Sequence, residues 1–137
     1  MKKVFIFAAV FCMANIFAAP KTEVIRDNSG RIISRATTNG NQTVYRDAKG
    51  KIISTATKTG NQIIYRDSSG KIIRRATVSG NQTVYRNAQG KIEATETKYN
   101  NNTIVRDSSG KIIGRKTQNN GNTIYRESRG HIKSTKR

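Results

Sequence analysis

Few residue types in this chain could do chemistry, and the acidic ones recur at a fixed spacing. Four aspartates stand 20 or 40 residues apart, each three residues before a glycine: Asp27, Asp47, Asp67 and Asp107. Paired acid–base catalysis needs two carboxylates near one reacting bond, whereas these are separated by whole repeats. An aspartate that opens an Asp-x-x-Gly turn accepts backbone N–H bonds, and that role accounts for all four.

The other reactive side chains are scarce. His131 is the only histidine, and it stands where other units carry Lys51 and Lys71, which indicates a surface substitution. The only cysteine is Cys12. A nucleophile–histidine pair or a usual zinc site needs more His and Cys than this, and Asp-Ser-Ser-Gly offers too few oxygens for a calcium loop. We therefore expect no enzyme activity, no cofactor, no metal and no small-molecule substrate.

Residues 1–19 have the pattern of a secretory signal peptide. Two lysines at positions 2 and 3 precede an apolar run at 4–14 and small residues at 18 and 19. The apolar run is too short to span a bilayer, which needs roughly 20 residues. We predict cleavage after Ala18 or Ala19, and a bacterial-type exported protein that is secreted, periplasmic or part of the cell envelope.

The chain after residue 19 is strongly basic and has a strand-like composition. It holds 24 of the 26 Lys and Arg and all 8 Asp and Glu, a net charge of +16, and it contains no Phe, Trp, Met, Cys or Leu. Its Ile, Val, Thr and Tyr favour strands. The positive excess permits binding to nucleic acid, anionic lipid or acidic polysaccharide, or it keeps an exposed sheet soluble.

Residues 20–137 form one predicted domain, built from six copies of a 20-residue unit of which the last is truncated. The second unit, VYRDAKGKIISTATKTGNQI, is representative. Asp at the first turn position and Gly at the fourth predict a β-hairpin with a type I turn closed by a left-handed residue. This assigns a structural turn role to Gly30, Gly50, Gly70, Gly90, Gly110 and Gly130.

Two strands per unit, at about 61–66 and 71–77 in the third unit, predict an all-β antiparallel meander of about eleven strands. Counting from the turn gives three opposite pairs, which are Arg46 with Ile52, Tyr45 with Ile53, and Val44 with Ser54. This register leaves neither face uniformly apolar, so we expect an extended thin sheet.

A parallel β-solenoid with one unit per coil is the alternative architecture. It would stack one arginine from every unit at about 4.8 Å, and like charges at that spacing repel. The two turn signals per unit also suit hairpins better, so the meander is preferred.

The YRDxxGKI core resembles the YD repeats of bacterial RHS-type surface and toxin-shell proteins, which have a similar period and the same Asp-x-x-Gly turn. The matching residues are Tyr45-Arg46-Asp47 with Gly50 and Ile52, Tyr65-Arg66-Asp67 with Gly70 and Ile72, and Tyr85-Arg86 with Gly90 and Ile92. The resemblance implies β-hairpin repeats. It does not imply the encapsulating role, because those repeats usually place Tyr directly before Asp and their shells need many more than six units.

An arginine in each unit and a lysine after most turn glycines are candidate polyanion-binding residues. They are Arg26, Arg46, Lys51, Arg66, Lys71, Arg86, Lys91, Arg106, Lys111 and Arg126. Since neighbouring residues of a strand alternate faces, Arg46 and Tyr45 lie on opposite faces and cannot form one base-stacking platform. Lys51 and Tyr45 would share a face, which leaves a weaker mixed patch.

The leading hypothesis is a non-enzymatic exported protein whose sheet is an adhesive or structural surface of the cell envelope or medium. The first alternative is a polyanion binder, whose partner would be lipopolysaccharide, extracellular DNA or an acidic glycan, motivated by the +16 charge. The second is a self-associating fibre subunit that assembles through free strands at the ends of the sheet.

Overall fold

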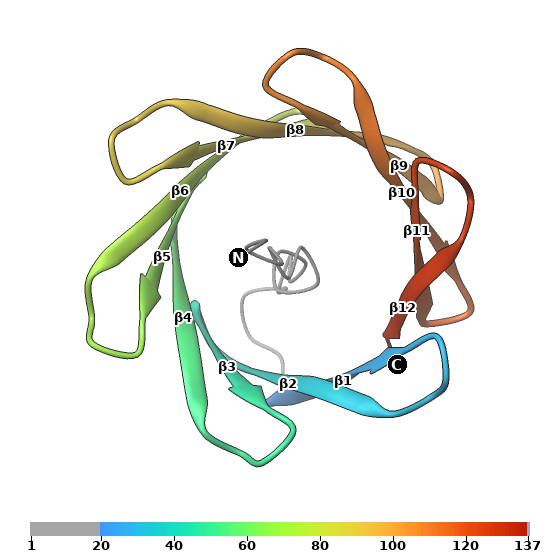
Figure 1. Cartoon of the computed structure of the whole chain (residues 1–137). Coiled ribbons are helices and arrows are strands. Elements are labelled where there is room, and N and C mark those ends of the chain that lie inside the picture. Colours follow the sequence, from blue (N-terminus) through green and yellow to red (C-terminus); the bar gives the residue numbers. More distant parts are fainter. Residues whose placement is uncertain (1–19, 137) are drawn as a thin grey trace, which may run out of the picture.

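The structure, a computed structural model, describes residues 20–136, which form twelve β-strands joined by short turns. In chain order they are β1 (Lys21–Asp27), β2 (Ile32–Asn39), β3 (Gln42–Asp47), β4 (Ile52–Thr59), β5 (Gln62–Asp67), β6 (Ile72–Ser79), β7 (Gln82–Asn87), β8 (Ile92–Tyr99), β9 (Asn102–Asp107), β10 (Ile112–Asn119), β11 (Asn122–Glu127) and β12 (Ile132–Lys136). Each strand pairs antiparallel with the next, and β12 pairs with β1, so the sheet closes into a barrel (Figure 1). The predicted signal peptide lies outside the described residues.

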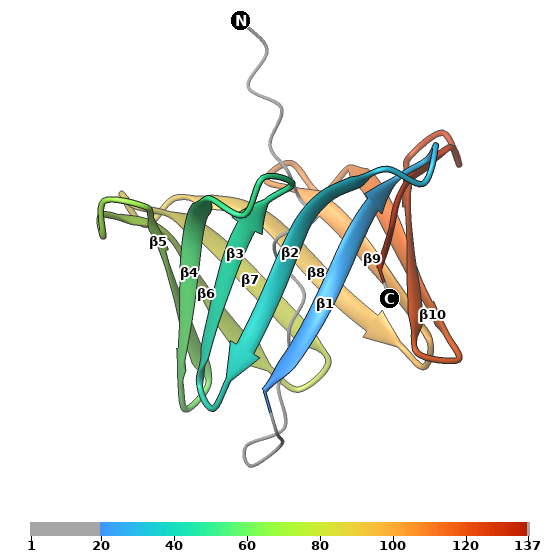
Figure 2. The ribbon, with the colours of Figure 1, turned by 90° about the horizontal axis from the view of Figure 1, so that it is seen from below.

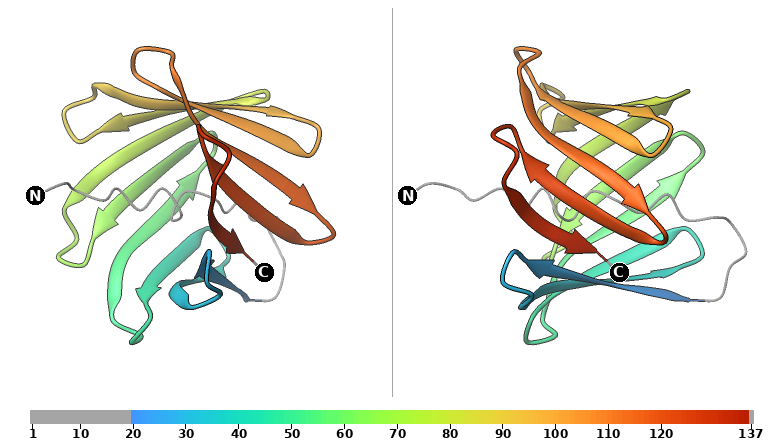
Figure 3. Two further views of the ribbon diagram at one scale, coloured as in Figure 1. Left: turned by 45° about the vertical axis from the view of Figure 1, so that its right-hand side comes forward. Right: turned by 90° about the vertical axis from the view of Figure 1, so that its right-hand side faces the viewer.

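The two kinds of turn lie at opposite ends of the barrel. Turns 27–30, 47–50, 67–70, 87–90, 107–110 and 127–130 join the two strands of each unit and lie at the top of Figure 2, which we call the upper end. Two-residue turns at 40–41, 60–61, 80–81, 100–101 and 120–121 join successive units at the lower end. The strands tilt against the barrel axis (Figure 3), as closure of a sheet requires.

Every unit contains a β-bulge just after its upper turn, and this corrects the predicted register. Tyr45 lies opposite Ser54 rather than Ile53, and Val44 lies opposite Thr55. The same shift occurs in the other five units. Because a one-residue slip moves the following side chains to the other face, the bulge places Ser54 and the later alternate residues of β4 on the same face as Tyr45.

The bulges also account for closure. A bulge bends its strand and increases the local twist, and six equal bulges bend the sheet in the same sense. The closing pair then repeats the register used between units: Arg26 lies opposite Thr135 as Arg66 lies opposite Thr55. Strand β1 therefore pairs with β12 in the same register in which β5 pairs with β4.

The prediction of an all-β antiparallel meander of hairpins is confirmed, and the open form is wrong. The described chain has twelve strands instead of eleven, and the sheet closes instead of extending as a thin layer. The expectation that neither face is uniformly apolar holds, because the buried side chains include Thr43, Glu96 and Lys116 beside the tyrosines and alanines. The solenoid is not confirmed, since neighbouring strands of the described chain pair antiparallel.

One side of the barrel interior is filled by tyrosine–alanine pairs. Ala36, Ala56 and Ala76 lie directly opposite Tyr45, Tyr65 and Tyr85 across the ladders between units, and all six are buried. The bulge residue Ile53 packs against this cluster. Side chains just fill a barrel of about eight strands, so a barrel of twelve needs residues as long as tyrosine to reach inward.

Ion pairs occupy the other side of the interior. Glu96 on β8 and Lys116 on β10 form a buried ion pair across β9, and both replace the alanine of the first three units. Glu23 on β1 binds Lys136 on β12 at 2.6 Å and thereby joins the two strands of the seam. Next to Lys116, the ring of Tyr125 lies over Gly114, where any side chain would overlap it.

Gly50→Ala should destabilise the protein by about 1–2 kcal/mol, because Gly50 has a φ of 90° that side-chain-bearing residues rarely adopt. The space around this position is open, so the cost is conformational rather than steric. The matched control is Gly60→Asn, expected to change stability by less than about 0.5 kcal/mol. Gly60 has a φ of 58°, and Asn100 already occupies the equivalent turn at 50°. Urea unfolding measures both, and equal losses would contradict the assignment.

Lys116→Ala should cost about 3–5 kcal/mol, because it leaves the Glu96 carboxylate buried without its cation. The double variant Glu96→Ala with Lys116→Ala restores the alanine of the first three units and should lose much less. Thermal or urea unfolding of the two variants makes the comparison. A double variant no more stable than the single one would show that the ion pair is not the cause.

Candidate functional site: the basic upper end

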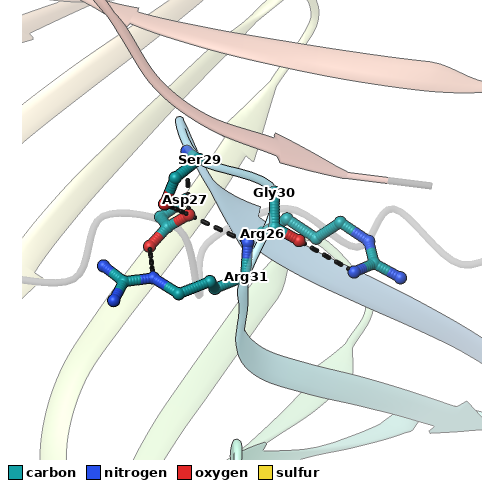
Figure 4. A network of polar contacts seen from close by, with 5 residues as sticks. All are labelled: Arg26, Asp27, Ser29, Gly30 and Arg31. Atoms are coloured by element: carbon teal, nitrogen blue, oxygen red, sulfur yellow. Dashed lines mark hydrogen bonds and ion pairs between the residues drawn. The ribbon is translucent and has the colours of Figure 1, made fainter.

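The upper turns are held by their first residue. In the first unit, Asp27 Oδ1 accepts the backbone N–H of Ser29 at 2.9 Å, that of Arg31 at 3.0 Å and the Ser29 hydroxyl at 2.7 Å (Figure 4). Its Oδ2 accepts Arg31 Nε at 3.0 Å. These donors, the Ser29 hydroxyl first, lower the pKa of Asp27 from 3.8 to about 2. The carboxylate is therefore ionised and fully occupied inside the turn.

The same turn recurs around the rim. Asp47, Asp67 and Asp107 accept equivalent backbone bonds, which confirms the turn-capping role predicted for the aspartates. Asn87 makes the same two backbone bonds in the fourth unit at 3.0 and 2.9 Å. Glu93, the remaining acid near this turn, pairs with Arg74 at 2.8 Å. Most carboxylates of the upper end are thus held by hydrogen bonds or ion pairs with neighbouring residues.

The arginine row lies on the outer face of the barrel directly below the turns. Arg26, Arg66, Arg86 and Arg106 each donate Nη1 to the carbonyl of the turn glycine in their own unit, at 2.9–3.2 Å. A guanidinium carries five N–H donors, so this bond fixes the side chain and leaves other donors for a ligand. The candidate arginines are therefore partly structural.

A second arginine row was missed by the sequence reasoning. Arg35, Arg75 and Arg115 recur every 40 residues and lie directly opposite Arg46, Arg86 and Arg126. Arg35 and Arg75 reach the carbonyls of Ala48 and Ala88 in the next turn at 3.3 Å. The 40-residue period is visible in the sequence, but only the strand pairing shows that these arginines lie opposite arginines of the first row.

The candidate lysines lie in the same region. Lys51, Lys71, Lys91 and Lys111 are exposed and follow the turn glycine. The structure therefore brings all the predicted polyanion-binding residues to one end of the barrel. The predicted patch of Lys51 with Tyr45 is wrong, because Tyr45 points into the barrel and is only 2% exposed.

Positive charge is concentrated at the upper end. The upper half of the repeat, residues 26–35 and the equivalent ten residues of the later units, contains 18 Lys and Arg and 6 Asp and Glu, a net charge of +12. The rest of residues 20–136 contains 5 Lys and Arg and 2 Asp and Glu, a net charge of +3. Because the upper half comprises the upper turns and adjoining strand residues, the charge forms a closed ring around the barrel.

One hollow lies near each end of the barrel. At the upper end, near the seam, an open hollow of about 420 Å³ is lined by Asn28, Glu127, Arg129, His131, Ile132 and Lys133. Inside the barrel, towards the lower end, a mostly apolar pocket of about 180 Å³ lies between Tyr45, Tyr65 and Lys58. Within residues 20–136, no group of three His, Cys, Asp or Glu side chains is placed to hold a metal ion. The described chain also has no helix long and apolar enough to cross a membrane.

In the variant Asp27→Asn/Asp67→Asn/Asp107→Asn, the free energy of unfolding should fall less steeply as the pH is lowered than it does in the parent protein. The pKa of each of these carboxyls is lowered, chiefly by the hydroxyl of the serine two residues later. Their contribution to stability is therefore present above the usual pKa of about 4 and is lost as the pH falls towards 2. The triple variant should fold at pH 7, since Asn87 makes the same backbone bonds. Unfolding midpoints between pH 7 and 2 test this, and an unchanged slope would contradict it.

Comparisons of the chain with protein-family models, with curated proteins and with solved structures found no match. The resemblance to YD repeats stays a prediction. The upper end is a closed ring of cations, in which four arginines are held by turn carbonyls and Lys51, Lys71, Lys91 and Lys111 are exposed.

Proposed function

We propose that this chain is an exported binding protein that holds polyanions at the upper end of its barrel. The observation that carries the proposal is the separation of charge, +12 in the upper half of the repeat against +3 in the rest. A net charge needed only for solubility has no reason to gather at one end. A ring of one sign concentrates the field there and attracts polyanions from solution.

The opposed arginines support this proposal. Like charges placed directly opposite each other on a sheet destabilise it, and three such pairs recur here. A bound phosphate, sulfate or carboxylate between the two guanidinium groups would turn that repulsion into two charge-assisted hydrogen bonds. The ring is thus more stable with an anion than without one.

The engagement of the carboxylates is the second support. Acidic side chains free to move would fold onto neighbouring lysines and compete with an external anion. At the upper end, the aspartates accept backbone N–H bonds and Glu93 pairs with Arg74. The exposed lysines Lys51, Lys71, Lys91 and Lys111 remain available to a ligand.

The concentration of charge at one end favours a polyanion binder over an adhesive or structural surface in the general sense. The fibre alternative loses its motivation, because free strands at the ends of the sheet are replaced within the described residues by the pairing of β1 with β12. Export and the lack of enzymatic activity remain predictions from the sequence.

Lys51→Gln with Lys91→Gln should weaken binding of the purified protein to heparin several-fold at physiological salt. Each lysine that is lost means that fewer counterions are released from the polyanion on binding. The plot of log K against log salt should therefore become less steep, by about one to two. The matched control is Lys58→Gln with Lys98→Gln, which removes two lysines from the lower half of the repeat and should change little. Titration across a salt series measures both. Equal effects of the two double variants, or no heparin binding by the parent protein, would refute the proposed function.

A further inference from the structure

Exposed apolar side chains gather at the same end as the charge. Among residues 20–136, five large apolar side chains are exposed, and four of them belong to the upper half of the repeat: Ile52, Ile73, Ile92 and Ile132, at 37–43% exposure. The fifth, Tyr99, lies at the lower end. Ile52, Ile92 and Ile132 share the ninth position of their units, whereas Ile73 is a tenth residue. Single exposed apolar residues are ordinary, but three half-exposed isoleucines at one repeat position form a patterned surface at one end of the barrel.

Each isoleucine of the ring has a fixed arginine neighbour. The ninth residue of every unit is an isoleucine, and it lies directly opposite the row arginine of its own hairpin, as Ile52 does with Arg46 and Ile132 with Arg126. The other four pairs are Arg26 with Ile32, Arg66 with Ile72, Arg86 with Ile92 and Arg106 with Ile112. Six arginine–isoleucine pairs therefore encircle the barrel just below the turns.

This pairing selects among polyanions. A linear polymer such as DNA or heparin supplies negative charge but little apolar surface for the isoleucines. A linear chain would also contact only part of a closed ring. An anionic bilayer supplies phosphate groups and, a few ångströms deeper, acyl chains, and it is flat enough to meet the whole ring. The upper turns fan outward from the barrel in Figure 1, so this end is broader than the ring of strands beneath it.

We propose that the upper end docks on the surface of an anionic lipid bilayer, with arginines and lysines on the phosphates and the isoleucine ring at the boundary with the acyl chains. This inference rests on the proposed function and names the ligand class of the same site. Arg46 has Ile52 directly opposite it, so a lipid whose phosphate binds the arginine also brings its apolar part near the isoleucine. The barrel axis is then perpendicular to the membrane surface, and the lower end faces away from the membrane.

The test compares two probes on one set of variants. Purified protein is titrated with vesicles of equal parts phosphatidylglycerol and phosphatidylcholine, with vesicles of phosphatidylcholine alone, and with soluble heparin. The variant Ile52→Thr/Ile92→Thr/Ile132→Thr keeps β-branched residues in the strands, and Tyr99→Thr is the matched control at the lower end. Unfolding by urea confirms that each variant is folded.

The parent protein should bind the anionic vesicles and not the neutral ones. The triple variant should lose on the order of 100-fold in vesicle affinity, about fivefold for each half-exposed isoleucine, while its heparin affinity stays unchanged. Tyr99→Thr should alter neither. Heparin binding without vesicle binding, or vesicle binding unaffected by the triple variant, would overturn the bilayer inference and leave the proposed function standing. Failure to bind either probe would overturn both.

Discussion

The register between neighbouring units is the same at every junction of the barrel, including the seam, and the other features depend on it. A bulge after each upper turn shifts the hairpin by one residue, and the ladder between units then restores direct pairing. Each unit therefore turns by the same amount and presents the same residues to the same face. Because the register is constant, the charged residues, the ninth-position isoleucines and the inward side chains recur around the barrel with the period of the repeat.

The interior shows how the repeat departs from perfect symmetry. The first three units place Ala36, Ala56 and Ala76 opposite the tyrosine of the next unit, while the later units carry Glu96, Lys116 and Lys136 at the alanine position. Burial lowers the pKa of Lys116, and Glu96 offsets part of that shift. Burial followed by the charge of Glu96 raises the pKa of Tyr85 well above its ordinary value. The ionic side of the interior is thus coupled to the tyrosine side through a single carboxylate.

Local features of this fold could be predicted from the sequence, and global ones could not. The hairpins and the capping aspartates follow from residue types within four positions of one another, such as Asp47 and Gly50, and the repeat follows from their recurrence every 20 residues. Closure depends on the bulge at Ile53. Residue preferences do not predict this bulge, because an isoleucine fits both the bulged and the bulge-free register. The ion pair between Glu96 and Lys116 spans a whole unit, so it is visible only once β8 and β10 are known to lie on either side of β9.

The candidate site also has a part that the sequence predicts and a part that depends on strand pairing. The row of Arg46 and its equivalents could be read from the repeat, whereas Arg35 gains its meaning only from lying opposite Arg46. The arginines are also held in advance: a guanidinium fixed to a turn carbonyl, as Arg66 is to Gly70, loses less freedom when it binds an anion. The lysines beside them are mobile, strongly hydrated charges that adapt to whatever anion is present. Rigid arginines set a fixed spacing of sites around the barrel, and the lysines tolerate irregularity in the ligand. A surface of many similar headgroups that rearrange beneath the protein satisfies both conditions better than a polymer whose charges are spaced along one line.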